Sequence, residues 1–182
     1  MKVLVLLADG VEEMEAVIVM DTLRRAQWQV VSASVSGPVL EASRGVKLVA
    51  DALLGDVEPA AFDVLVVPGG MGGVDCFRAS AEVLSLMRMF IETDGKVLAA
   101  ICAAPLALQE AGVLESRTYT SHPAVADQLT CGTRCDERVV VDGNLVSSQG
   151  PGTAFEFALK LVELLDAPEL AAQLKAEMLV SA

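Results

Sequence analysis

The stretch Lys96-Val-Leu-Ala-Ala-Ile-Cys-Ala-Ala-Pro105 decides how the rest of the chain is interpreted. An apolar run that favours a β-strand stops at Cys102, and small residues, a proline and a helical pattern follow at once. This junction predicts a sharp strand-to-helix turn, with the sulfur beside the first free N–H groups of a helix. Those groups and the helix dipole favour a thiolate, so Cys102 is a candidate nucleophile. The alternative is a small buried hydrophobic residue, which describes most free cysteines.

Apolar strand patterns alternate with longer helical patterns along the whole chain. We predict strands over 3–7, 30–35, 63–67, 97–101 and 118–120, hairpins over 39–42/46–49 and 139–141/145–148, and helices over 14–26, 81–92, directly after 102, from 123 to 129, 153–165 and 168–175. Near-continuous hydrophobic strands of this kind indicate a mostly parallel sheet covered by helices on both faces. We therefore expect one α/β domain over residues 1–182, built as a three-layer sandwich.

Composition excludes several classes of function. The net charge is −12, and no cluster of Lys or Arg provides the electrostatic footprint of a nucleic-acid-binding protein. No apolar run approaches the roughly 20 residues of a membrane span, and we interpret the apolar N-terminus as a buried strand of a cytoplasmic protein rather than a signal peptide. The chain has four cysteines, of which Cys131 and Cys135 lack metal-ligand spacing, and a single histidine, so we expect no metal site.

Five segments follow strand ends and are expected to converge, because ligands of open α/β sheets sit outside the carboxyl ends of the strands. They are 9–15, 69–73, 102–104, 121–123 and 150–153.

Glu15 is the second candidate for chemistry. It stands in the first turn of a predicted helix, and Ala16-Val-Ile-Val-Met20 follows it without a polar break. Such a helix is buried, so Glu15 enters a covered region where a carboxyl has a raised pKa and can move protons. Its neighbours Glu12 and Glu13 need only complement the helix N-terminus, a reading that also remains open for Glu15.

The other candidates are weaker. His122, the single histidine, lies on a predicted loop and either relays protons or has a structural role. The backbone N–H groups of Gly70 and Ala103 are candidates to stabilise an oxyanion beside the cysteine, although 68–73 is equally a plain tight loop. Arg44 in the first hairpin turn and Arg25 at the end of the first helix are either solvated or contact a substrate carboxylate or a second subunit.

These motifs together resemble the ThiJ/PfpI superfamily, and within it the parkinsonism-associated deglycase branch. The landmarks, in one order along nearly the whole chain, are Ala8-Asp-Gly-Val-Glu-Glu-Met-Glu15, Leu23-Arg-Arg-Ala26, Ser43-Arg44, Val67-Pro-Gly-Gly70, Ala99-Ala-Ile-Cys-Ala-Ala-Pro105, Thr120-Ser-His-Pro123 and Gly150-Pro-Gly-Thr-Ala-Phe-Glu-Phe157. Two departures matter. Ala103 stands where the protease-like branch has histidine, so we do not expect a peptidase, and Gln149 stands where close members often carry arginine.

The resemblance implies a flavodoxin-like sandwich, a homodimer, and no metal or organic cofactor. It also implies that Cys102 is the reactive cysteine, Glu15 the acid bonded to it, His122 the nearby histidine, and Gly70 and Ala103 the backbone donors. It places Arg44, Arg25 and Gly152 at a substrate or subunit contact. The implied activities are glutathione-independent conversion of methylglyoxal to lactate, deglycation of methylglyoxal adducts, and protection against stress.

Three functional hypotheses follow, the third being an unrelated flavodoxin-like binding module that uses the glycine loop 68–73. The first is an enzyme acting on a small aldehyde or a glycated amine through a hemithioacetal at Cys102. The second is a non-enzymatic redox sensor or chaperone, in which Cys102 oxidises to a sulfinic acid beside Glu15.

Overall fold

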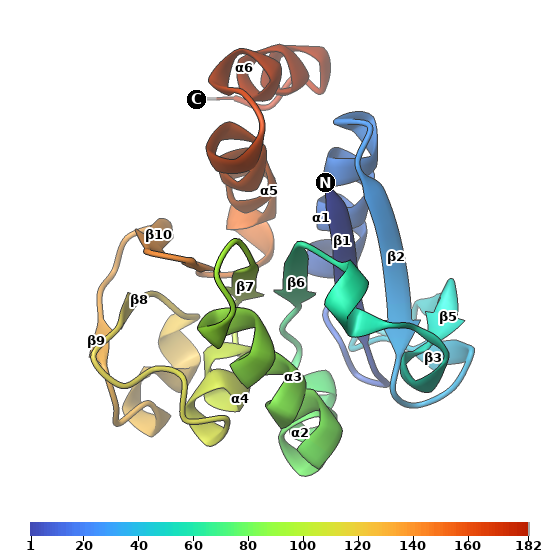
Figure 1. Cartoon of the computed structure of the whole chain (residues 1–182), viewed down its shortest axis with the longest axis vertical. Coiled ribbons are helices and arrows are strands. Elements are labelled where there is room, and N and C mark those ends of the chain that lie inside the picture. Colours follow the sequence, from blue (N-terminus) through green and yellow to red (C-terminus); the bar gives the residue numbers. More distant parts are fainter. Residues whose placement is uncertain (182) are drawn as a thin grey trace.

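The computed structural model describes residues 1–181 and has a seven-stranded sheet at its centre (Figure 1). Its strands are β1 Lys2–Leu7, β2 Gln29–Ser34, β5 Ala52–Leu53, β6 Val64–Val67, β7 Val97–Ile101, β10 Val139–Asp142 and β11 Leu145–Ser148. They lie in the order β10-β11-β7-β6-β1-β2-β5, and every neighbouring pair is parallel except β10 with β11. The predicted mostly parallel α/β sheet is confirmed.

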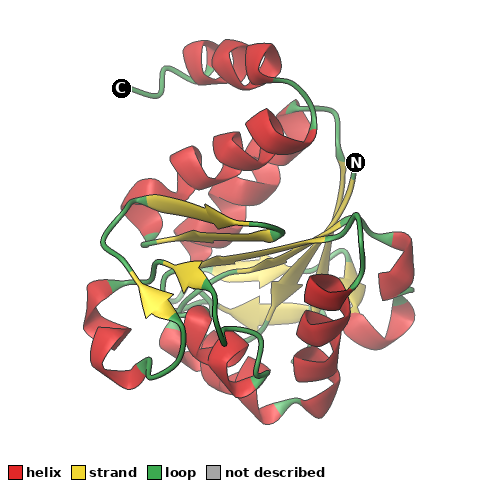
Figure 2. Ribbon diagram, turned by 60° about the vertical axis from the view of Figure 1, so that its left-hand side comes forward, coloured by secondary structure: helices red, strands yellow, loops and turns green. Residues whose placement is uncertain are grey.

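Helices cover the two faces of this sheet (Figure 2). Contacts between helices separate two groups: α1 Glu13–Arg25 packs on α5 Ala154–Leu165, while α2 Met71–Ala79, α3 Ala81–Glu92 and α4 Pro105–Glu110 pack on one another. The last helix, α6 Pro168–Glu177, packs on α5. No helix in the described part of the chain is long and apolar enough to cross a bilayer.

The central strands are buried on both sides. Val3 to Leu6 in β1 and all four residues of β6 are 0% exposed, and the two strands pair in register from Val3 with Val64. A strand covered by helices on both faces has no polar side, so its sequence is apolar throughout rather than alternating. This explains why apolar runs in the sequence were sufficient to predict the sheet.

Smaller elements accompany the central sheet, among them two separate two-stranded sheets. Both predicted hairpins are present: β3 Val39–Glu41 pairs with β4 Lys47–Val49, and β10 pairs with β11. A second small sheet joins β8 Thr118–Tyr119 to β9 Thr133–Arg134, and three-residue or six-residue 3-10 helices lie at Leu54–Asp56, Pro59–Ala61, Pro123–Gln128 and Pro151–Thr153. The two-residue strands β5 and β9 were not predicted, because two residues carry no periodic signal.

The prediction of a loop over 68–73 was wrong, since α2 begins at Met71. Glycines at 72 and 73 lower helix propensity, and this masked the helix in the sequence. They are required by packing, because a Cβ at Gly73 would lie 2.9 Å from the Cα of Val11. The helix therefore rests directly on the loop that follows β1.

The strand order reverses between β6 and β1, since the chain proceeds from β1 to one side and from β6 to the other. In open α/β folds this switch point opens a crevice at the carboxyl ends of the strands. The segments after β1, β6 and β7 meet there.

Candidate active site

Cys102 occupies a strained turn directly after β7. Its φ is +67°, a left-handed conformation that non-glycine residues rarely adopt. Hydrogen bonds hold it on both sides, because its N–H donates to the carbonyl of Ser148 at 2.9 Å and its carbonyl accepts from the N–H of His122 at 2.8 Å. Since α4 begins only at Pro105, the turn rather than the helix end positions the sulfur. Strain of this kind, held by surrounding structure, is typical of functional sites.

The Gly69-Gly70 turn faces Cys102 from the end of β6. A Cβ at Gly69 would lie 2.5 Å from the Cβ of Cys102 and 2.9 Å from its Sγ, so only glycine fits there. Gly70 has a φ of +84° and is the N-cap of α2. The N–H groups of Gly70 and Ala103 lower the pKa of the Cys102 thiol. Both predicted backbone donors therefore lie close to the sulfur.

Glu15 reaches the same point from the first turn of α1. It is 0% exposed, and its Oε2 accepts a 2.7 Å hydrogen bond from the N–H of Gly69. Its Oε1 is buried and has no partner among the described residues. Burial raises the pKa of Glu15 to about 7, although hydrogen bonding to Cys102 and Gly69 opposes the rise. The carboxyl therefore exchanges its proton near neutral pH.

The acidity expected for Cys102 differs from what its surroundings produce. Burial raises the pKa of the thiol, and the charge of an ionised Glu15 raises it further. The N–H groups of Gly70 and Ala103 act in the opposite direction and lower it. The prediction from the turn alone was wrong in sign, because it counted the backbone dipoles and not the desolvation. The thiol and the carboxyl therefore influence each other's pKa and titrate as a coupled pair.

His122 lies beside this pair, after β8. Its Nδ1 accepts a hydrogen bond from the N–H of Ala124 at 3.2 Å, so the neutral ring carries its proton on Nε2. Its Cδ2 lies against Gly150, where an added Cβ would lie 3.2 Å away, and the same Cβ would lie 4.0 Å from Oε1 of Glu15. The imidazole and the unpartnered carboxyl oxygen therefore border a common space next to Gly150.

A pocket of about 750 Å³ opens above the sulfur. All five segments predicted to converge contribute to its lining or lie directly behind it. The lining residues are Asp9, Gly10, Glu12, Glu41, Ala42, Ser43, Arg44, Gly70, Met71, Gly72, Cys102, Ala103, His122, Ala124, Val125 and Pro151. Glu15 does not line the pocket, because it is buried behind Gly69. We call Gly69, Gly70, Cys102 and Glu15 the inner wall.

Four residues at the mouth form what we call the rim: Glu12, Glu13, Ser43 and Arg44. The Ser43 hydroxyl bridges the two carboxylates, at 2.8 Å from Oε2 of Glu12 and 3.0 Å from Oε2 of Glu13. The N–H of Arg44 donates to Oε1 of Glu13 at 3.0 Å, and its side chain is exposed in the pocket mouth. Sequence reasoning missed this role of Glu12 and Glu13. The expectation that these acids only complement the helix N-terminus did not anticipate that both are buried, at under 9% exposed.

Desolvation opposes ionisation of Glu13, but hydrogen bonds outweigh it. Its own N–H, the Ser43 hydroxyl and the N–H groups of Arg44 and Val46 lower the pKa of this carboxyl. The rim therefore carries a fixed negative charge at neutral pH.

Two predicted site residues lie outside the pocket. Arg25 is at the far end of α1, where it pairs with Asp21 at 2.7 Å, one turn earlier in the same helix. Gly152 is exposed, and its carbonyl accepts a 2.9 Å hydrogen bond from Arg138, so its neighbour Pro151 and not Gly152 lines the pocket. The expected substrate contact is therefore not at this pocket for either residue, and the alternative, a contact with a second subunit, stays a prediction.

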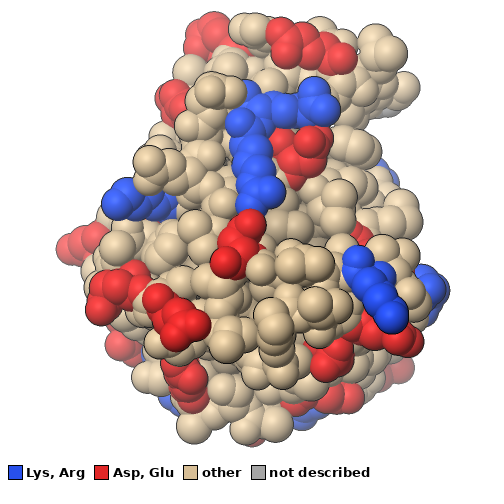
Figure 3. Space-filling view, turned by 90° about the vertical axis from the view of Figure 1, so that its right-hand side faces the viewer, with Lys and Arg blue, Asp and Glu red and all other residues tan. Residues whose placement is uncertain are grey.

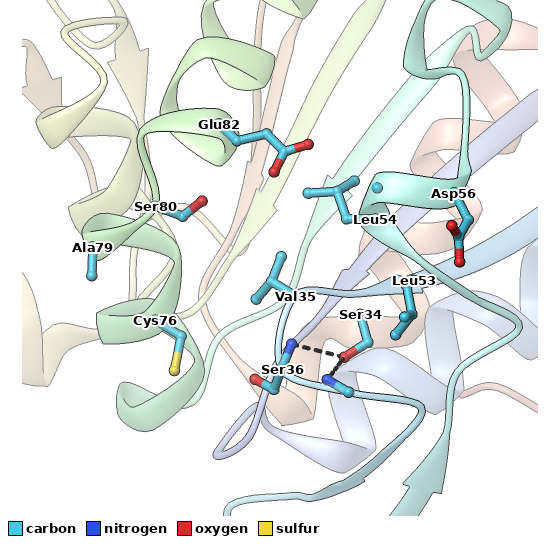
Figure 4. Close-up of a pocket in the computed structure, with 12 residues that line it drawn as sticks. Ser34, Val35, Ser36, Leu53, Leu54, Asp56, Cys76, Ala79, Ser80 and Glu82 are labelled. Atoms are coloured by element: carbon cyan, nitrogen blue, oxygen red, sulfur yellow. Dashed lines mark hydrogen bonds between the residues drawn. The ribbon is translucent and has the colours of Figure 1, made fainter.

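A second hollow of about 600 Å³ lies beyond α2, between this helix and the ends of β2 and β5 (Figure 4). Cys76 lines it, and the Ser34 hydroxyl accepts hydrogen bonds from the N–H groups of Ser36 and Gly37. Cys102 is absent from its lining. The two hollows are separate, and the inner wall belongs to only one.

Charge on the surface is mixed on the face that Figure 3 shows. Its few basic side chains lie beside acidic ones and do not form a continuous basic field. The ion pairs likewise join surface basic side chains to neighbouring acidic ones. Arg24, for example, pairs with Asp51 at 2.7 Å.

Comparison with known proteins identifies the family. The model of the DJ-1/PfpI family matches residues 1–164. The chain is 42% identical over 181 residues to Protein DJ-1 homolog B of Arabidopsis thaliana, covering 98% of this chain but only 41% of that protein. It is 37% identical over 164 residues to Glutathione-independent glyoxalase DJR-1.2 of Caenorhabditis elegans, covering 88% of this chain and 86% of that one.

A solved structure shows the same architecture. The crystal structure of Drosophila melanogaster DJ-1beta superposes with a TM-score of 0.95 at 41% identity, covering 100% of this chain and 98% of that one. The resemblance expected from the sequence motifs is confirmed. With a family model matching nine-tenths of its length and relatives at about 40% identity, the chain belongs to the DJ-1/PfpI family.

Proposed function

We propose that this protein is a cysteine-dependent enzyme that acts on small α-oxoaldehydes such as methylglyoxal. One observation carries the proposal: a sulfur on a strained turn has a buried carboxyl of pKa about 7 on one side and two backbone N–H donors around it. A relative at 37% identity bears the name of a glutathione-independent glyoxalase, which supports the same chemistry.

In the proposed reaction, the Cys102 sulfur attacks the aldehyde carbon as its proton passes to the Glu15 carboxylate. The N–H groups of Gly70 and Ala103 stabilise the oxyanion of the hemithioacetal. A proton then moves from the former aldehyde carbon to the adjacent carbon, carried by Glu15 with help from His122, which leaves a thioester of a 2-hydroxy acid. Water hydrolyses the thioester, releasing the acid and restoring the thiol. With a methylglyoxal–amine carbinolamine as substrate, the Cys102 sulfur displaces the amine from the carbinolamine carbon, the amine leaves with the proton released by the thiol, and the same hemithioacetal forms and proceeds to the acid.

The lining of the pocket supports an uncharged substrate. Three carboxylates face it, from Asp9, Glu12 and Glu41, against the single guanidinium of Arg44. This excess of negative charge disfavours entry of a carboxylate and favours release of a carboxylate product. A neutral aldehyde and an acidic product fit this balance.

The test is turnover of methylglyoxal, followed by formation of lactate. We expect wild-type protein to produce lactate without glutathione and Cys102→Ser to lose roughly a hundredfold or more of kcat. The matched control is Cys76→Ser, in the separate hollow, which should retain kcat. Absence of lactate, or equal rates for wild type and Cys102→Ser, would refute the proposal.

A second candidate function is a redox sensor, favoured by the same carboxyl. A protonated Glu15 can donate a hydrogen bond to a sulfinate formed when two equivalents of peroxide oxidise Cys102. Intact-mass measurement after mild peroxide separates the candidates. Gain of two oxygens in wild type but not in Cys102→Ser, together with negligible aldehyde turnover, would favour the sensor.

We further propose that the protein forms a homodimer through the outer face of α1. Met14 and Val17, one turn apart in this helix, are 54% and 44% exposed, and Val49 of the neighbouring hairpin is 74% exposed. Exposed large apolar side chains on one helix face and on the hairpin beside its first turn are candidates for a subunit contact. Light scattering of wild type should give twice the chain mass, and Val17→Glu should give one chain mass. A monomeric wild type would exclude the dimer.

A further inference from the structure

Arg134 is a largely buried arginine for which the proposed reaction has no use. It ends β9, and its side chain is 18% exposed. Its Nε donates to the hydroxyl of Ser121 at 2.9 Å, and its Nη2 donates to the carbonyl of the same residue at 3.2 Å. The Nη2 also pairs with Asp136 at 2.7 Å. A guanidinium that is removed from water and directed at one residue by two donors restrains that residue strongly.

Ser121 directly precedes His122. The short segment before the imidazole is buried, with Thr120 and Ser121 both 0% exposed. Strand β11 holds one side of it, because the N–H of Thr120 donates to the Ser147 hydroxyl at 2.9 Å. Arg134 holds the other side. The N–H of His122, in the same peptide unit as the Ser121 carbonyl, donates to the carbonyl of Cys102. A continuous set of hydrogen bonds thus runs from Arg134 to the strained cysteine turn.

We infer that Arg134 is a positioning residue for His122. It fixes the main chain at Ser121, and this sets both the direction of the imidazole and the hydrogen bond to the Cys102 carbonyl. That Arg134 orients His122 does not depend on the proposed function, whereas the expected effect of Arg134 on catalysis rests on it. Arg134 does not line the pocket and is not expected to touch substrate.

The two contacts with Ser121 require the planar, forked guanidinium of arginine. A lysine at this position keeps the charge but presents one ammonium, which cannot reproduce both contacts with Ser121 in the same plane. Arg117 is a matched control, because it is also partly buried, at 28% exposed, and stands next to β8 in the same small sheet. Its Nη1 donates to the carbonyl of Asp142, the last residue of β10. This contact lies at the end of β8 that is farther from His122.

The experiment uses the only histidine of the chain as its own probe. With ¹⁵N-labelled histidine, wild-type protein should show one imidazole with its proton on Nε2, because Nδ1 accepts from Ala124. We expect Arg134→Met to shift these signals towards a mixture of tautomers, and Arg134→Lys and Ser121→Ala to shift them less. Arg117→Met should superimpose on wild type. Imidazole signals that are unchanged in Arg134→Met would overturn the inference.

Kinetics supply the second readout. We expect kcat for methylglyoxal to fall about tenfold in Arg134→Met, with KM within about twofold, because a misplaced group affects the transition state more than binding. If Arg134→Met does not fold, Arg134→Lys and Ser121→Ala decide, and wild-type imidazole signals in both would refute the role. A wild type without turnover would refute the proposed function, while the imidazole signals would still test the positioning.

Discussion

The inner wall and the rim of the pocket are built in different ways. At the inner wall, backbone atoms leave no space for side chains larger than glycine, and Glu15 retains a carboxyl oxygen without a partner among residues 1–181. At the rim, side chains satisfy one another, and the Ser43 hydroxyl bridges two carboxylates. An incompletely satisfied carboxyl has a pKa suited to moving protons, whereas a fully bonded one is a fixed charge.

Two glutamates in one helix turn show the difference. Glu13 and Glu15 are both buried by α1, yet burial raises the pKa of Glu15 to about 7 while hydrogen bonds lower that of Glu13. Their distance along the sequence is two residues, and the helix directs them to different partners. We propose that the inner wall carries the chemistry and that the rim shapes its entrance.

The largest expected effect comes from placing a methyl group in the inner wall. Gly70→Ala combines a φ of +84° with a Cβ that would press on backbone atoms of Gly10, Val11 and Glu12. We expect a loss of roughly 4 kcal/mol in the free energy of unfolding, from strain and overpacking together. Urea denaturation measures it. The control is Gly152→Ala, whose Cβ would have no neighbour within 4 Å and should cost less than about 0.5 kcal/mol. Equal stabilities for the two variants would contradict this account of the inner wall.

The next effect is on turnover. Glu15→Gln keeps the shape of the carboxyl and loses its proton transfer, so we expect kcat for methylglyoxal to fall about 10²- to 10³-fold. Glu13→Gln, its counterpart at the rim, should lower kcat less than about fivefold. A comparable fall in both variants would remove the distinction between wall and rim. Single-turnover kinetics with matched protein concentrations would give the ratio.

The pH dependence of stability should be opposite for these two residues. Glu15 has a folded pKa of about 7 against a usual 4.5, so its contribution is fully present below pH 4.5 and is lost as the pH rises through 7. The Glu15→Gln variant should therefore gain about 3 kcal/mol relative to wild type between pH 4.5 and 8.5. For Glu13 the folded pKa is lowered, so its contribution is present above pH 4.5 and is lost as the pH falls through the folded pKa. Urea titrations at several pH values would show whether the trends diverge, and parallel trends would contradict the assignment.

The smallest effect is expected at the rim. Ser43→Ala removes the hydroxyl that bridges Glu12 and Glu13, at a cost of about 1 kcal/mol in the free energy of unfolding. We expect kcat to stay within about twofold of wild type. KM should rise modestly, because Glu13, which accepts a hydrogen bond from the N–H of Arg44, is less firmly held without the Ser43 hydroxyl. A large fall in kcat for this variant would show that the rim takes part in the chemistry.

Much of this molecule could be predicted from local patterns. The apolar runs of β1, β6 and β7 indicated a parallel sheet because strands covered on both faces contain no polar side. The position of Cys102 at a strand end indicated the site, and the run of apolar residues after Glu15 indicated that this carboxyl is buried. Each inference depended on residues adjacent in the chain.

The remaining features depend on residues that are far apart in the sequence. Helix α2 was missed because its glycines weaken the local signal, yet contact with the β1 loop requires them. Arg25 and Gly152 were expected at a substrate or subunit contact; the structure places both outside the pocket, and the subunit contact stays a prediction.

The sequence by itself determined the mostly parallel sheet, the covering helices other than α2, the place of Cys102 at a strand end and the burial of Glu15, while their pairing was implied only by the family resemblance. Only the tertiary structure decided the pKa shifts of Cys102 and Glu15 and the hydrogen bonds from Arg134 to Ser121. The reason is physical. Strand and helix patterns arise from neighbours in the chain, whereas desolvation and hydrogen bonding depend on every group that packing brings within a few ångströms.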